Sequence, residues 1–261
     1  MMELDQWYSY LARLNRSPET IRTYRSVMRG FPEPMEATIE QAEEWWVGLD
    51  GLSPAQRAKS LAVVRSFYNY AQRFDLRADN PTRRLDPPKI GLGMPKFVSR
   101  SELVTLMNAV EGDLRRAIAL GAYAGLRVAE VAALDWADVD VETRWLTVRG
   151  GKGNKDRLVD VPPLLLDELL PEAKGNVVAA GGKPYTASAL DRKANRAMKA
   201  AGIPHSFHKL RARFATVGYG ATGNLLAMQR ALGHSSPTTT ARYAATNDDD
   251  LRAIGSAVTR G

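Results

Sequence analysis

Hydrophobic residues recur at helical spacing through the first 86 positions of the chain. Leu4, Trp7 and Leu11 lie on one face of a predicted first helix. Ser17 followed by Pro18 is a typical helix start, because serine can cap the free backbone N–H groups and proline fits the first turn. The pattern therefore predicts two helices at the beginning of the chain.

Two capping boxes predict the next helices of this region. Thr38 with Gln41, and Ser53 with Gln56, place a hydroxyl and an amide group three residues apart, which satisfies free backbone N–H groups at a helix start. The helix after Ser53 is the longest, and its hydrophobic residues form one stripe that must be buried. The stripe consists of Leu61, Val64, Phe67, Tyr68 and Ala71. Residues 1 to 86 are therefore expected to form a compact, helical, core-type domain.

Helical spacing stops after this domain. Residues 87 to 97 contain three prolines and two glycines, which disfavour a regular helix and predict an extended linker. Ser99 with Glu102 then forms a further capping box. A helix near residues 113 to 124 can end at Gly125 in a left-handed conformation. We expect a second domain over residues 98 to 261.

Hydrophobic alternation predicts a β-hairpin within this second domain. Residues 145–148 and 158–161 are strand-like, and the glycine-rich stretch 150–154 separates them. Helical patterns return after Pro163 and continue in three segments. These segments are residues 186–201, 208–219 and 225–232, of which the first and last are followed by the helix stops Gly202 and Gly233. The predicted fold is mostly α with a small antiparallel β-sheet.

Charge adds a class of partner to this picture. The chain carries a net charge of +7 and has a pI near 9.7, which favours a polyanion such as nucleic acid. Residues 1 to 86 hold twelve basic and twelve acidic residues, so the surplus lies in the remainder. The first domain nevertheless segregates its arginines from an acidic cluster. This suits a domain that contacts DNA on one side, and it equally suits solvated helix surfaces.

Composition also excludes several classes of protein. The chain has no cysteine, so it can form neither disulfides nor thiolate metal sites. No hydrophobic stretch is long enough to span a bilayer, and no leader precedes the first predicted helix. We therefore expect a cytoplasmic protein without membrane association.

Five separated segments hold the polar residues that metal-free phosphoryl transfer requires. This chemistry needs a nucleophile, cations for the developing charge and an acid for the leaving oxygen. The candidate residues are Arg127, Lys152, His208 with Arg211, His234 and Tyr243. His205 and His208 do not have the spacing of a zinc-protease pair, so no metal site is expected.

Each candidate also has a less specific interpretation. Arg127 could be a surface residue that pairs with Glu130 one helical turn later. Lys152 could simply make a soluble turn, and Tyr243 could be half-buried packing. Against the first of these, Arg127 lies among small and apolar residues after Gly125. A guanidinium group in such a place needs a bound anion or Glu130 as its partner.

Taken together and in this order, the segments resemble the tyrosine recombinase, or phage integrase, family over nearly the whole chain. Residues 124–130 resemble the family's first arginine box, and residues 151–157 resemble its catalytic hairpin. Residues 208–211 and 228–243 resemble its second box, and residues 17–24 look like part of its core-type DNA-binding domain. Lys209 and Ala212 depart from the pattern, since an acidic residue and a histidine are frequent at these positions.

The resemblance implies cleavage of DNA without a cofactor or metal. Tyr243 would attack a scissile phosphate to give a 3′-phosphotyrosine and a free 5′-hydroxyl. Lys152 would be the general acid for the 5′ oxygen. His208 would assist proton removal from Tyr243, whose ordinary pKa near 10 makes it a poor nucleophile at neutral pH.

The same resemblance implies how the phosphate is held. Arg127 and Arg211 would bind the non-bridging oxygens, where negative charge develops, and His234 would add a hydrogen bond. Glu130 would orient Arg127 or His208.

The resemblance also implies a two-domain DNA clamp and its partners. These are two double-stranded recombination sites, a tetramer of the chain on DNA, and an accessory DNA-bending or directionality factor. The residues expected to contact DNA outside the catalytic site are Arg22, Arg25, Arg57, Lys59, Arg65, Lys155 and Arg157. A tail helix after Asn247 is expected to join protomers, with packing in cis as the alternative. No arm-binding domain is expected, which makes this a minimal member of the family.

The expected function is site-specific recombination, with integration and excision of a phage or mobile element as its setting. Three alternatives remain at this point. One is Xer-type resolution of chromosome or plasmid dimers, and a second is a type IB topoisomerase-like relaxation of DNA. The third is a DNA-binding protein that kept the fold and lost catalysis.

Overall fold

The computed structural model describes residues 2–90, 96–150, 156–169 and 174–233. The chain divides into two compact units, Met1–Leu92 and Gly93–Gly261. The assignment of residues 87–97 as a linker stays a prediction. Outside the described residues lie the predicted hairpin tip with Lys152 and Lys155, and also His234, Tyr243 and the tail helix. No helix in the described ranges is long and apolar enough to cross a bilayer.

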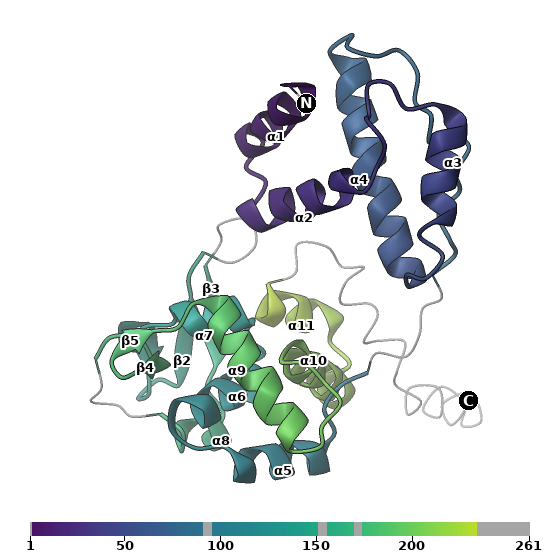
Figure 1. Cartoon of the computed structure of the whole chain (residues 1–261). Helices are drawn as coiled ribbons and strands as arrows, with labels where there is room; N and C mark the ends of the chain where they lie inside the picture. The colour runs from purple at the N-terminus through teal and green to yellow at the C-terminus, as the bar shows by residue number, and fades with distance from the viewer. Residues whose placement is uncertain (1, 91–95, 151–155, 170–173, 234–261) are drawn as a thin grey trace, which may run out of the picture. The chain divides into compact units, whose positions relative to one another are not determined.

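The described part of the first unit contains four α-helices (Figure 1). They are α1 (Met2–Arg13), α2 (Pro18–Arg29), α3 (Ile39–Val47) and α4 (Pro54–Arg73). The hydroxyl of Ser17 accepts a hydrogen bond from the backbone N–H of Thr20 at 3.2 Å. The capping boxes that begin at Thr38 and Ser53 are both present. The prediction of a four-helix region with these starts is confirmed.

An aromatic core holds this unit together. Trp7 and Phe67 are fully buried, and their rings pack edge to face with centroids 5.4 Å apart. Tyr24 stacks on Trp7 at 5.6 Å, and the hydroxyl of Tyr68 donates to the carbonyl of Pro34 at 2.9 Å. The ring contacts join α1, α2 and α4. The predicted stripe of α4 is buried throughout, because the other helices of the unit cover this apolar face.

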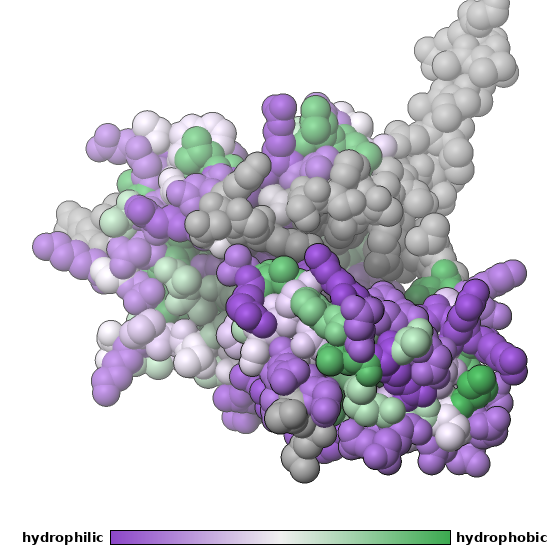
Figure 2. Space-filling view, turned by 90° about the horizontal axis from the view of Figure 1, so that it is seen from above, coloured by the Kyte–Doolittle hydropathy of each residue, from purple (hydrophilic) through white to green (hydrophobic). Residues whose placement is uncertain are grey.

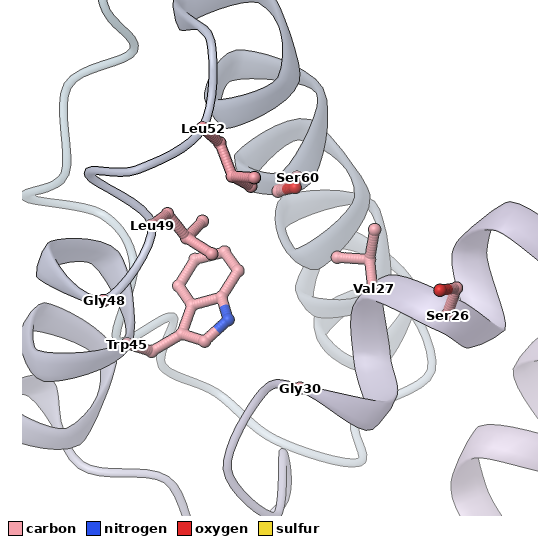
Figure 3. A pocket seen from close by; sticks show the side chains of 8 residues that line it. All are labelled: Ser26, Val27, Gly30, Trp45, Gly48, Leu49, Leu52 and Ser60. Carbon is pink, nitrogen blue, oxygen red and sulfur yellow. The ribbon is translucent and has the colours of Figure 1, made fainter.

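A hollow of about 450 Å³ lies in the first unit between α2, α3 and α4. Figure 3 shows the indole ring of Trp45 beside this space, with Val27 and Leu52 at its other sides. Ser26 and Ser60 are the only hydroxyl-bearing residues among the described ones that line it. These lining residues include no ionisable side chain, so the hollow offers shape rather than charge.

The surface of the protein is mostly hydrophilic on the face that Figure 2 shows, with hydrophobic residues in small separate groups. The large exposed hydrophobic residues of the described ranges are spread over both units, from Leu14 and Val47 to Val217 and Leu226. Apolar residues scattered in this way are ordinary on a globular surface.

The second unit is built mainly from helices. The described ones are α5 (Arg100–Ala109), α6 (Gly112–Tyr123), α7 (Val128–Ala133), α8 (Pro163–Leu166), α9 (Ala187–Ala200), α10 (His208–Thr222) and α11 (Leu225–Leu232), with one 3-10 turn at Trp136–Asp138. Figure 1 shows α10 next to α11, and α10 packs against both α11 and α6. The capping box at Ser99 is present, and Gly202 and Gly233 have the left-handed conformation predicted for helix stops.

Two small antiparallel sheets complete the described part of the second unit. The first has the strand order β1 (Val139–Asp140), β2 (Trp145–Val148) and β3 (Arg157–Asp160). The second pairs β4 (Ala179–Ala180) with β5 (Lys183–Pro184). The predicted fold class, mostly α with a small antiparallel sheet, is confirmed. β1, β4 and β5 were not predicted, because two residues are too few to show an alternating pattern.

The predicted second strand of the hairpin was wrong by one residue. It was expected over residues 158–161, whereas β3 begins at Arg157, which pairs with Val148. The backbone N–H of Val161 instead donates to the carbonyl of Arg144 at 2.9 Å. Strand pairing with β2 sets this register, and Arg157 therefore lies inside the sheet.

Helix α6 forms the centre of the second unit, with every residue from Ala117 to Ala122 buried. A Cβ atom at Gly121 would lie 2.9 Å from Phe207, so glycine lets the start of α10 pack closely. Gly125 has φ +66°, and a Cβ atom there would lie 2.4 Å from Phe214. Only glycine fits both this conformation and this contact, so Gly125 fixes how the chain passes from α6 to α7.

Candidate active site

Glu130 lies at the centre of a group of three arginines from three different parts of the second unit. We call Arg127, Arg157 and Arg211 together with Glu130 the arginine cluster. Its side chains come from the start of α7, from strand β3 and from helix α10. Three guanidinium groups and one carboxylate leave two net positive charges on the cluster.

Arg127 occupies the position just before α7, and Glu130 lies one turn later in that helix. The backbone N–H of Arg127 donates to Oε2 of Glu130 at 2.8 Å, and Nη1 of Arg127 donates to Oε1 at 2.7 Å. The first bond satisfies a free N–H at the helix start. With 31% of its side chain exposed, Arg127 is the most accessible arginine of the cluster.

Arg211 lies on α10 and is almost completely buried, with 2% of its side chain exposed. Its Nη1 donates to the carbonyl of Gly125 at 2.6 Å and lies 3.7 Å from Oε2 of Glu130. Its Nη2 donates to the carbonyl of Leu232, the last residue of α11. Arg211 therefore joins the ends of α6 and α11 and places a cation beside Glu130.

Arg157 binds both carboxylate oxygens of Glu130 through its side chain. Its Nη1 donates to Oε1 at 2.9 Å and its Nη2 to Oε2 at 2.8 Å, which is a bidentate pair. Its Nε donates to the carbonyl of Ala231 at 2.8 Å. Only 8% of the Arg157 side chain is exposed. This residue connects β3, α7 and the last turn of α11.

The electrostatics of the cluster keep Glu130 ionised. Burial raises the pKa of this carboxyl group, but hydrogen bonds from Arg157 and from the backbone N–H of Arg127 outweigh it. The pKa falls to about 2. Glu130 is therefore a carboxylate at neutral pH and acts as an acceptor only.

His208 is the first residue of α10 and lies one helical turn before Arg211. Partial removal of the ring from water lowers the pKa of His208, and the positive charges of Arg211, Lys209 and Arg127 lower it further. The ordinary pKa of histidine is about 6.5. His208 is therefore neutral at pH 7, the form in which a histidine can accept a proton.

The structure thus brings together the described members of the predicted set. Arg127, Glu130 and Arg211 are in contact, and His208 is near enough to Arg127 and Arg211 for their charges to lower its pKa. Glu130 was expected to orient Arg127 or His208, and among the described contacts it binds Arg127. Lys152, His234 and Tyr243 lie outside the described residues, so their roles stay predictions.

The assignment of Arg157 as a DNA contact stays a prediction, and the structure gives its guanidinium group partners within the protein. All three of its described hydrogen-bond donors point to protein acceptors, and the side chain is buried. A sequence signal existed: Arg157 and Val159 are two residues apart in a strand and so share a face, and Val159 is buried.

The other predicted DNA contacts differ in how accessible they are. Arg65 donates to the carbonyls of Thr82 and Leu85. Arg57 pairs with Asp50 at 2.8 Å and lies over the ring of Trp46. Arg22, Arg25 and Lys59 are all exposed, with Arg22 beside Glu19 and Arg25 over the ring of Tyr8. Arg65 and Arg57 therefore have structural partners within the first unit.

Comparison with known proteins gives the family. The model of the phage integrase family matches residues 96–250. The chain is 29% identical to the tyrosine recombinase XerA of Thermococcus kodakarensis, over 95% of this chain and 92% of the relative. It is 32% identical to the tyrosine recombinase XerC of Corynebacterium glutamicum, over 88% of this chain and 82% of the relative. The chain therefore belongs to the phage integrase family and is a tyrosine recombinase.

A solved structure agrees with this assignment at the level of the fold. The lambda integrase tetramer bound to a Holliday junction is similar with a TM-score of 0.75 and 21% identity. The match covers 91% of this chain and 77% of the integrase chain.

Proposed function

We propose that this tyrosine recombinase cuts and rejoins double-stranded DNA at specific sites, with Tyr243 as its nucleophile. The arginine cluster is the observation that carries the proposal. It holds two net positive charges, with Arg127 partly exposed and Arg211 fixed by two carbonyls. Such preorganised cations stabilise the charge that develops on a phosphate during transfer.

The proposed step is a transesterification. The phenolic oxygen of Tyr243 forms a bond to the scissile phosphorus, and the bond from phosphorus to the 5′ oxygen breaks. His208, neutral at pH 7, helps to take the phenolic proton, and Lys152 gives a proton to the leaving 5′ oxygen. Arg127 and Arg211 hold the non-bridging oxygens, with a further hydrogen bond from His234. Attack by a 5′-hydroxyl reverses the step, so the balance requires no outside source of energy.

The biological setting is the integration and excision of a phage or mobile element, in the cytoplasm of a bacterial host. Xer-type resolution of dimers is the second candidate, since the relatives reported above are named XerA and XerC. Sequencing the DNA that is trapped covalently on the protein inside its host distinguishes the two. Attachment sites of an element would support integration, and one recurrent chromosomal or plasmid site would support resolution. The same DNA can be tested for a bound bending or directionality factor.

Substitution of Tyr243 tests the chemistry itself. A nicked suicide substrate, which loses its 5′-hydroxyl fragment after cleavage, should become covalently attached to the wild-type protein. Tyr243→Phe should bind the same DNA and trap none, because it lacks the nucleophilic oxygen. The measurement is denaturing gel electrophoresis of labelled DNA followed by mass spectrometry of the linked peptide.

Tyr185→Phe is the matched control for this experiment, since it removes a hydroxyl from the same unit. The Tyr185 hydroxyl accepts a hydrogen bond from Lys193 and has no described contact with the arginine cluster. The control should trap DNA as the wild type does. A covalent adduct in Tyr243→Phe would show that another residue is the nucleophile.

Assembly is the second part of the proposal. The lambda integrase structure reported above is a tetramer on a Holliday junction, and we propose that four copies of this chain join two DNA sites. The tail sequence after Asn247 has acidic residues at a helix start and then Leu251, Ile254 and Val258 on one face. So short a helix is stable only when that face is buried, which suits docking on a neighbouring protomer.

Deletion of residues 247–261 tests this assembly. The truncated protein should bind a single site almost as the wild type does, because the predicted DNA contacts remain. Synapsis and recombination should be lost, as measured by native gels of two-site complexes and by recombination of a two-site plasmid. Normal recombination by the truncated protein would rule out a role of the tail in joining protomers.

A further inference from the structure

Arg157 is the one member of the arginine cluster to which no role in the reaction has been given. It is not a surface residue, since 8% of its side chain is exposed. Its contacts are also specific. Nη1 and Nη2 donate to the two carboxylate oxygens of Glu130, and Nε donates to the carbonyl of Ala231. The burial of this charged side chain and its three hydrogen bonds need a physical explanation.

The explanation lies in the charge of Glu130. A buried carboxylate attracts whatever cations are near it, and Arg127 and Arg211 are both near. Arg127 gives Glu130 one side-chain hydrogen bond, and Arg211 stays 3.7 Å away. Arg157 gives two, one to each oxygen, at 2.9 and 2.8 Å. Among the described contacts, Arg157 is therefore the side chain that gives Glu130 the most hydrogen bonds.

We propose that Arg157 is a positioning residue that serves as the dedicated counter-ion of Glu130, so that Arg127 and Arg211 remain directed to the scissile phosphate. Without Arg157, Arg127 is left as the main counter-ion of the carboxylate that it already binds at 2.7 Å, and Arg211 is drawn toward it from 3.7 Å. Their charge is then partly neutralised, and they leave the geometry in which they stabilise the transition state. This inference rests on the proposed cleavage by Tyr243.

A second contact supports a role in geometry rather than in stability alone. The Arg157 side chain also lies against the end of α11, where a Cβ atom on Gly233 would be 3.1 Å from Cδ of Arg157. The carbonyls of Ala231 and Leu232 bind Arg157 and Arg211 respectively. Both arginines thus bind the last turn of one helix, and both lie beside the same carboxylate.

A double-mutant cycle with Glu130→Gln tests the counter-ion role. Arg157→Met keeps the apolar volume and removes the charge. It should slow single-turnover cleavage of a suicide substrate by about 10²-fold, the order expected when catalytic groups are displaced by about 1 Å. DNA affinity, measured separately, should change little. In the Glu130→Gln background the carboxylate charge is absent, so the loss from the same substitution should be smaller by a factor of at least roughly ten.

Two further variants guard against misfolding, which is checked by thermal melting before each rate is measured. Arg157→Gln removes the charge and keeps a hydrogen-bond donor, so it should behave as Arg157→Met does in both backgrounds. Arg157→Lys restores a positive charge and should recover most of the lost rate.

Arg149→Met is the matched control. Arg149 follows β2 of the same hairpin and pairs with Asp138 at 2.5 Å, so its loss should leave cleavage near the wild-type rate.

The outcomes separate this inference from the proposed function. A wild-type protein that forms no Tyr243 adduct would remove the proposed function. If the wild type forms the adduct and folded Arg157→Met cleaves equally fast, Arg157 has no part in positioning. An equal loss of rate from Arg157→Met in the wild-type and Glu130→Gln backgrounds would show that Arg157 acts independently of the carboxylate charge, and it would overturn the inference.

Discussion

Arg211→Ala should lose DNA cleavage by roughly three orders of magnitude, since removal of one preorganised donor from a transition state typically costs about 10² to 10³ in rate. The substitution also removes the cation beside Glu130 and leaves the carbonyls of Gly125 and Leu232 without this donor. Breaking a buried charged contact on one side destabilises a protein by about 3–5 kcal/mol. The variant should therefore melt earlier than the wild type, and its cleavage is measured well below its own melting temperature.

Arg213→Ala is the control for the Arg211 experiment. Arg213 lies two residues later on α10, is partly buried and donates to the carbonyl of Val98 at 3.2 Å. Its loss removes a similar side chain from the same helix without touching the arginine cluster. It should lower stability and leave the cleavage rate of the folded protein almost unchanged. If both variants cleave at the wild-type rate, Arg211 is not part of the phosphate-binding site.

The helices of this protein could be predicted because their signals are local. The capping boxes at Thr38, Ser53 and Ser99 each lie within four residues, and all three are present. The helix stop at Gly233 depends on the left-handed conformation of one residue. Such features need no knowledge of distant parts of the chain.

The strands and their register were harder to predict for a physical reason. A strand of two residues such as β1 has no period to detect, and its existence depends on pairing with β2. The start of β3 at Arg157 instead of Leu158 is set by the partner Val148 across the sheet. Arg157 was expected to contact DNA, and only this pairing shows that its side chain lies in the sheet with 8% exposed.

The candidate site shows the same division between local and distant information. The pairing of Arg127 with Glu130 spans one helical turn, so sequence spacing was enough to suggest it. The bidentate pair of Arg157 and Glu130 joins residues 27 positions apart, and no local pattern indicates it. The basic residues of the first unit were expected to contact DNA without knowledge of their partners in the fold. Arg57 has Asp50 and Trp46 as partners that only the fold brings near.

The glycine that follows α6 links the fold to the site. The carbonyl of Gly125 accepts a hydrogen bond from Arg211 at 2.6 Å, and the positive φ of this residue directs that carbonyl. The next residues lead to Arg127 and to α7. Gly125 therefore helps to place both arginines. Its carbonyl binds Arg211, and the chain that follows it leads to Arg127.

Lys152→Ala should slow cleavage by about two to four orders of magnitude if Lys152 protonates the leaving 5′ oxygen, because general acid catalysis contributes about that much. Lys152 lies outside the described residues, so its role is assigned from the sequence pattern. The role has a chemical test that does not depend on geometry. A sulfur atom at the 5′-bridging position leaves readily without a proton, so a substrate with this sulfur bypasses the need for an acid.

The sulfur substrate should affect the cleavage rates of Lys152→Ala and Arg127→Ala differently. In the proposed mechanism Arg127 acts on the non-bridging oxygens, whose charge develops with either leaving atom. The sulfur substrate should therefore restore cleavage by Lys152→Ala far more than cleavage by Arg127→Ala. Single-turnover rates on matched oxygen and sulfur substrates give the comparison. Equal restoration of both variants would mean that Lys152 does not supply the proton, and the acid would then have to be sought among the other residues of the hairpin.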